Sequence, residues 1–156
     1  MERLRAEAQG AFDALHLPPR LTLEALIAHV EAVRGRRMKI IETSKLAGKA
    51  ICGLWVPRED VDVVYHSVTR GRLHRQQMVL HEIAHMILRH DEAKEATWQG
   101  ISVFREISGE VVQRALARGD FRCDLEVTAE YLADLLAAAI RDSAREEICG
   151  YGALFE

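Results

Sequence analysis

The feature that most constrains this chain is a short run, LHEIAHMILRHD at residues 80–91, which places three histidines and a glutamate among apolar residues. Imidazole and carboxylate groups are costly to bury unless something pairs with them. The segment is therefore either a core helix whose histidines are satisfied by neighbours or a helix whose polar groups surround a metal ion.

The spacing of these polar groups favours the metal ion. His81 and His85 belong to a His-Glu-x-x-His motif. On an α-helix, residues four apart lie about 40° apart on one face, so both imidazoles can reach one tetrahedral zinc ion. Glu82 lies next to them as a general base for water activated by the metal. The sequence therefore predicts a catalytic zinc site in this segment.

The third ligand has more than one candidate. His90 lies about 140° from His85 around a continuous helix, so it is not expected to join the same ion. Asp91 has the spacing of extended metalloprotease motifs, but those motifs need a glycine where this chain has Leu88. Glu126, in the first turn of a later helix, is the better candidate. The alternative for Glu126 is an acid that is merely favoured at a helix N-terminus.

The later helix has an apolar face that orients its acidic residues. Glu126 lies at the edge of this face, whereas Glu130 and Asp134 lie further round the helix. We therefore expect Glu126 to point inward. The apolar face consists of Ala129, Leu132, Ala133, Leu136 and Ile140.

The coarse pattern predicts one α+β domain over residues 1–156, with an N-terminal helix in residues 1–20 and a core in residues 21–145. Pro18-Pro19 ends the first helix, and Thr22 caps a second helix that stops before Gly35. A small three-stranded sheet follows, which we expect to be antiparallel because its last connection is too short for a crossover. The strands are expected at 38–41, 50–56 and 61–65, and further helices at 70–90, 108–119 and 125–145, with Thr69 as the cap of the first of these.

Composition excludes several classes of protein. The net charge of −3 argues against a direct nucleic-acid surface. The three cysteines, Cys52, Cys123 and Cys149, are far apart and odd in number, which favours a reducing compartment over a disulfide framework. No apolar run approaches the length of a membrane span. We therefore expect a cytoplasmic protein with no membrane contact.

Beyond the metal motif, the chain resembles the ImmA/IrrE family of small, gluzincin-like metallo-endopeptidases. The resemblance covers roughly residues 21–140 and rests on five segments: 34–37, 52–56, 69–74, 81–85 and 126–133. It implies His81, His85 and Glu126 as metal ligands and Glu82 as general base. It also implies that such a chain cuts a repressor or another regulator inside the cell. Many members have Asn at the position of Glu130.

Other residues are weaker candidates for the same site. His74, two turns before His81 on the same face, either lines the cleft or is a plain surface histidine. Tyr65 and Tyr131 either stabilise the oxyanion of peptide hydrolysis or are core tyrosines. Gly53-Leu54-Trp55 either forms an edge strand that pairs with an extended peptide or simply packs in the sheet.

These observations predict a zinc-dependent endopeptidase that acts on a protein partner, such as a transcriptional repressor. The rival function is a metal-containing regulatory module that docks the repressor or partner without cutting it. A purely structural zinc domain is a third reading, but three protein ligands with an open fourth position suit catalysis better.

Overall fold

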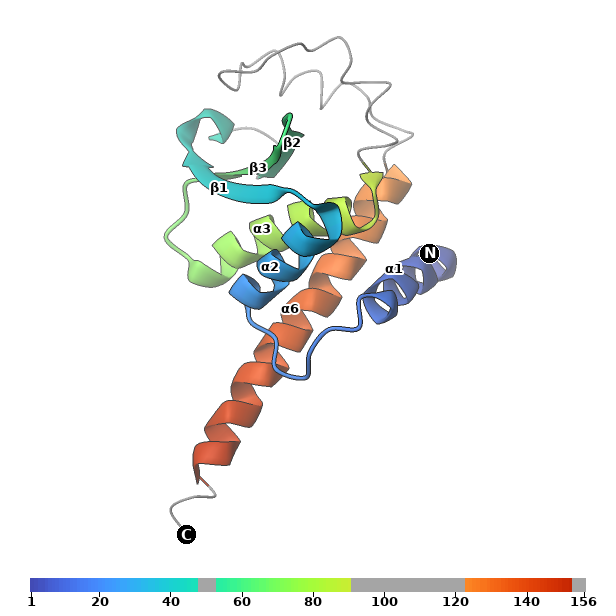
Figure 1. The fold of residues 1–156 in the computed structure, drawn as a ribbon, viewed down its shortest axis with the longest axis vertical. Helices are drawn as coiled ribbons and strands as arrows, with labels where there is room; N and C mark the ends of the chain where they lie inside the picture. Colours follow the sequence, from blue (N-terminus) through green and yellow to red (C-terminus); the bar gives the residue numbers. More distant parts are fainter. Residues whose placement is uncertain (48–52, 91–122, 153–156) are drawn as a thin grey trace.

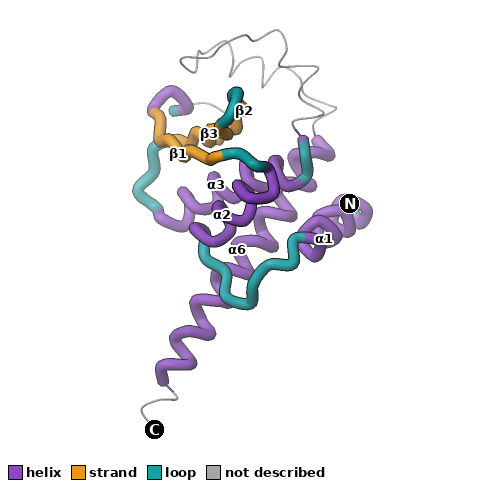
Figure 2. The backbone as a smooth tube through the Cα atoms, viewed as in Figure 1, coloured by secondary structure: helices purple, strands orange, loops and turns teal. Residues whose placement is uncertain are grey.

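The computed structural model describes residues 1–47, 53–90 and 123–152. These residues form an α+β structure, as the sequence predicts (Figures 1 and 2). No helix in these ranges is long and apolar enough to cross a membrane. In chain order the elements are α1 (Glu2–Ala14), α2 (Leu23–Arg34), β1 (Arg37–Thr43), the 3-10 turn η1 (Ser44–Leu46), β2 (Gly53–Pro57), β3 (Val61–Ser67), α3 (Arg72–Ile87) and α6 (Cys123–Gly152).

The three strands form a mixed sheet in the order β1-β3-β2, so the prediction of an antiparallel sheet was wrong for one pair. β2 and β3 are antiparallel, with Trp55 opposite Val64. β1 is parallel to β3, with Ile40 opposite Val64. The short connection between β2 and β3 constrains only those two strands. β1 reaches β3 through a longer stretch of chain that contains β2, and this stretch permits the parallel arrangement.

Helix α3 is the central element of the molecule. It contacts β2 and β3 on one side and α6 on another, while α2 contacts both α3 and β1. Helix α1 lies against α6 (Figure 1). Trp55 and Val64 face this helical layer and join the main core, together with Leu80 and Ile83 of α3 and Leu132 of α6. Because the second half of α3 is covered on several sides, its polar side chains there need internal partners.

A buried ion network ties the start of the sheet to α2. The Asp62 carboxylate on β3 accepts hydrogen bonds from Arg34 Nε (2.6 Å) and from the Trp55 indole nitrogen (3.0 Å). Arg36 Nε lies 3.3 Å from the same carboxylate. The Arg34 guanidinium also lies 4.9 Å from the centre of the Trp55 ring. One carboxylate thus links α2, the entrance to β1, and both strands of the hairpin.

Several helix boundaries follow the predicted capping residues, and others do not. The Thr22 side chain accepts a hydrogen bond from Ala25 N–H, and Gly35 ends α2 in the left-handed conformation, with φ of 63°. Thr69, the predicted cap of the next helix, instead accepts from Gly71 N–H, and Gly71 is the N-cap of α3.

Helix α6 begins earlier and ends later than expected, at Cys123 and Gly152. The helix predicted at residues 108–119 and the residue Asp91 lie outside the described residues.

Candidate metal centre

His81 and His85 lie on one face of α3, as their spacing predicts. Their Nε2 atoms are 3.1 Å apart, so both nitrogens can reach one metal ion. The His85 side chain is only 2% exposed, whereas that of His81 is 23% exposed. The pair therefore forms a site with a buried side and a side that solvent can reach.

Glu126 completes the group from α6. Its Oε2 atom lies 3.1 Å from His81 Nε2 and 3.4 Å from His85 Nε2. In a tetrahedral zinc site with ligand distances of about 2.0–2.1 Å, neighbouring ligand atoms lie about 3.3 Å apart. The three observed separations match this value, so His81, His85 and Glu126 form a group that can hold a metal ion. The choice of Glu126 over the other acids of α6 agrees with this geometry.

Glu82 lies beside this group and under the edge of the sheet. Its side chain is buried, and α3 carries it toward β2. A Cβ atom built on Gly53, at the start of β2, would be 3.0 Å from Glu82 Oε1 and 3.3 Å from its Cγ. The missing side chain of Gly53 therefore leaves the space that the Glu82 carboxylate occupies.

Each histidine of the group has a second partner on its other ring nitrogen. His81 Nδ1 lies 2.9 Å from Glu130 Oε2, one turn after Glu126 on α6. His85 Nδ1 lies 2.7 Å from His90 Nδ1, and both of these rings are buried. Such outer partners fix the orientation of ligand histidines. Sequence reasoning missed both.

Glu130 could have been found from the sequence. It follows Glu126 by four residues, which is the spacing that joins His81 to His85, so both acids lie on one face of α6. The two carboxylates contact opposite nitrogens of the His81 ring.

The metal-binding group and its neighbours Glu82 and Glu130 together carry an excess of negative charge. Burial alone lowers the pKa of His81, but the hydrogen bond with Glu126 and the charges of Glu82, Glu126 and Glu130 outweigh it and raise this pKa to about 9. Burial raises the pKa of Glu126, but hydrogen bonds and charge from His81 and His85 hold it well below its usual value. Three carboxylates around two imidazoles form an environment that favours a cation.

The structure does not bring the weaker candidates to the metal group. His74 is exposed, and its Nδ1 lies 3.2 Å from Thr69 Oγ1 at the start of α3. The Tyr65 hydroxyl accepts a hydrogen bond from Arg58 (3.3 Å). The Tyr131 ring lies 4.9 Å from the Arg5 guanidinium of α1.

Tyr65 is also on the wrong face of the sheet. Tyr65 pairs with Leu54 of β2. The neighbouring pair in the register is Trp55 and Val64, and the side chains of that pair face α3. Neighbouring residues of a strand point to opposite faces, so Tyr65 points away from α3.

The segment Gly53-Leu54-Trp55 does lie near the site. Among the described strands, β2 pairs only with β3 and forms one edge of the sheet. The Trp55 side chain packs in the core, and Gly53 borders Glu82. The segment therefore combines sheet packing with an edge next to the metal group.

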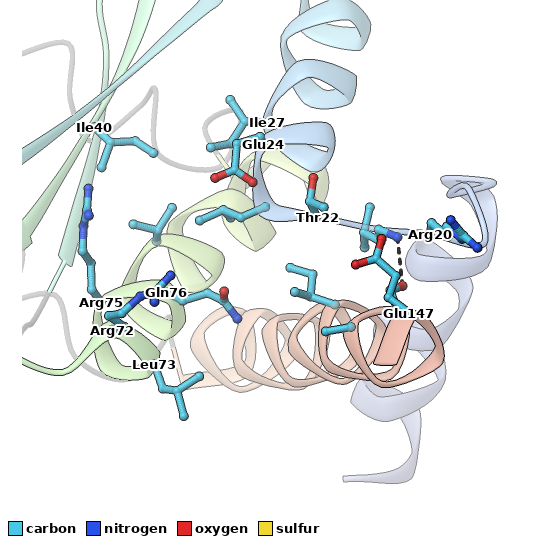
Figure 3. A pocket seen from close by; sticks show the side chains of 16 residues that line it. Arg20, Thr22, Glu24, Ile27, Ile40, Arg72, Leu73, Arg75, Gln76 and Glu147 are labelled. Carbon is cyan, nitrogen blue, oxygen red and sulfur yellow. Dashed lines mark hydrogen bonds between the residues drawn. The ribbon is translucent and has the colours of Figure 1, made fainter. Parts of the chain in front are cut away.

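A pocket of about 640 Å³ lies away from this centre, near the N-termini of α2 and α3 (Figure 3). It is bordered by Arg72 and Arg75 of α3, Glu24 and Ile27 of α2, and Glu147 of α6. None of the metal-binding group, nor Glu82, lines it. The pocket is therefore separate from the candidate metal centre.

The chain was compared with protein-family models, with curated proteins and with solved structures, and none of the three comparisons gave a match.

Proposed function

We propose that this protein is a zinc-dependent endopeptidase that cleaves a regulatory protein. The observation that carries the proposal is the convergence of His81, His85 and Glu126 at tetrahedral spacing with a buried glutamate, Glu82, directly beside them. Two histidines and one carboxylate are a ligand set of catalytic zinc sites, which keep a fourth position open. A purely structural site would not need Glu82.

Zinc bound to this group would acidify a water molecule and polarise the scissile carbonyl. Glu82 would take a proton from the attacking water and pass it to the leaving amine. The edge of β2 offers backbone groups that can pair with an extended peptide, and Gly53 brings this edge close to Glu82. The regulatory target is proposed from the sequence resemblance to ImmA/IrrE peptidases.

Metal analysis tests the first half of the proposal. The purified chain should contain about one zinc ion, because the group has one set of three converging ligand atoms. His81→Ala and His85→Ala should each lose it, as two ligands hold zinc poorly. Full zinc occupancy in both variants would show that the metal lies elsewhere.

Glu82→Gln tests whether the site cuts its target. The amide keeps the size of the carboxylate but cannot accept the proton, so zinc content and folding should persist. Loss of a general base typically slows a reaction by about 10²- to 10⁴-fold. Cleavage is measured by co-expression with candidate repressors and analysis of fragments, with the exposed Glu42→Gln as the matched control. If Glu82→Gln relieves repression as well as the unaltered chain does, the protein acts by docking.

A further inference from the structure

The chain makes a tight turn directly after α3. The helix ends at Ile87, and Arg89 adopts the left-handed conformation, with φ of 55°. On a continuous helix His90 would lie about 140° from His85. Instead, this turn returns His90 to His85, and their Nδ1 atoms are 2.7 Å apart.

If His85 binds a metal ion through Nε2, the contact requires a particular nitrogen of each ring to carry the proton. His85 Nε2 points to His81 and Glu126, so its lone pair must be free to bind a metal ion. The proton of a neutral His85 then lies on Nδ1, which must donate a hydrogen bond. The neighbouring atom is His90 Nδ1, which accepts only if the proton of His90 lies on Nε2.

We propose that His90 is a positioning residue for the metal centre. By accepting the hydrogen bond from His85 Nδ1, it holds the His85 ring in the tautomer and orientation that present Nε2 to the metal. This role rests on the proposed function, because it concerns the same zinc site. Glu130 has the equivalent position at His81.

His81 has a carboxylate partner, Glu130, whereas His85 has an imidazole partner, His90, and the burial of each partner explains this difference. Glu130 is 56% exposed, so its carboxylate remains solvated. His85 and His90 are 2% and 4% exposed. A carboxylate at position 90 would add a buried charge to a cluster that already contains Glu82, Glu126 and Glu130, and burying a charge is costly. A neutral imidazole accepts the hydrogen bond without that cost.

Zinc affinity, measured by competition with a chromogenic chelator, tests this role without any substrate. His90→Ala should weaken zinc binding by about 10- to 100-fold, as loss of an outer-shell partner typically does. His90→Asn offers an amide oxygen near the position of Nδ1 and should restore most of the affinity. His74→Ala is the control: it removes an exposed imidazole of α3 and should leave the zinc affinity unchanged. Cobalt(II) spectra of the same variants should show a distorted geometry only in His90→Ala.

Unchanged affinity in His90→Ala would overturn the inference, as would a failure of His90→Asn to restore binding. Long-range ¹H–¹⁵N spectra of the unaltered zinc form provide a readout that needs no substitution. They should place the proton of His85 on Nδ1 and that of His90 on Nε2, and the reverse placement at His90 would refute the role. A chain that binds zinc as expected but cuts no protein would overturn the peptidase proposal and leave this inference standing.

Discussion

Gly53 of β2 lies directly against the Glu82 side chain, beside the candidate metal centre. The position is not special for its backbone dihedrals, because Gly53 is an ordinary residue of β2. Its importance lies in the space next to it, where any side chain would meet the carboxylate at 3.0 Å. The Glu82 carboxylate is thus kept in place partly by the absence of a side chain on a neighbouring strand.

Gly53→Ala should therefore displace Glu82 while the metal ligands stay in place. A misplacement of about 1 Å at a catalytic group can cost about 10²-fold in rate, so we expect cleavage to slow by about 10- to 100-fold at normal zinc content. Gly10→Ala is the control, because a Cβ there meets nothing within 4 Å. It should raise stability by about 0.5–1 kcal/mol and leave cleavage unchanged. Equal cleavage rates in the two variants would contradict the steric argument.

Residue spacing predicted the members of the candidate metal-binding group better than it predicted their hydrogen-bond partners. The period of the helix was enough to bring His81 and His85 together and to aim Glu126 at them. It could not predict the contact of His90, because no glycine or proline marks the end of α3, and the left-handed turn falls on Arg89. Where a helix stops depends on tertiary packing that one sequence does not reveal.

The ion network around Asp62 joins elements that are far apart in the sequence. Its carboxylate is 2% exposed, and the side chain of its partner Arg34 is 15% exposed. Removing one partner from a buried ion pair leaves an uncompensated charge. The same carboxylate satisfies the Trp55 indole nitrogen, so several elements depend on one side chain.

Asp62→Ala should lower the free energy of unfolding by about 3 kcal/mol, because it leaves the Arg34 charge and the Trp55 N–H without this acceptor. Chemical denaturation monitored by circular dichroism measures the change. Asp60→Ala, at an exposed position in the turn before β3, should stay within about 0.5 kcal/mol of the unaltered chain. A loss of similar size in both variants would mean that the network adds nothing specific.

The elements themselves were easier to predict than their order in the sheet. Three short runs rich in β-forming residues predicted the strands, and Thr22 and Gly35 predicted both ends of α2. The position of β3 between β1 and β2 leaves no such local signal, since pairing depends on which strand covers which part of α3. Local patterns therefore predicted the described elements and the candidate metal-binding group, but not the pairing of β1.

Across the whole molecule, the metal centre depends on how closely α3 and α6 pack. Two of the candidate ligands come from α3 and one from α6, so the distance between these helices sets the size of the site. Ala133 is completely buried. It follows Glu126 by seven residues, which places it about 20° from Glu126 around the helix, on the side that faces α3.

Ala133→Leu should force the two helices apart. Overpacking of this kind costs about 1–3 kcal/mol of stability. The displaced Glu126 should also weaken zinc binding by at least about tenfold, which corresponds to about 1.4 kcal/mol. Chelator competition and thermal unfolding measure the two effects, and the exposed Ala144→Leu on the same helix serves as control. Unchanged zinc affinity in a destabilised Ala133→Leu chain would show that the site tolerates movement of α6.

Because α6 is long, a small tilt of the helix produces a large displacement at its ends. The helix has 30 residues, and Glu126 is near its first end, while the other end extends beyond the rest of the described structure (Figure 1). Ten residues, about 15 Å, separate Glu126 from the packed Leu136. A rigid rod that pivots there by about 5° moves the carboxylate by about 1 Å, far more than the roughly 0.2 Å that coordination distances tolerate. A tilt of α6 that moves its projecting end would therefore also move Glu126 relative to His81 and His85.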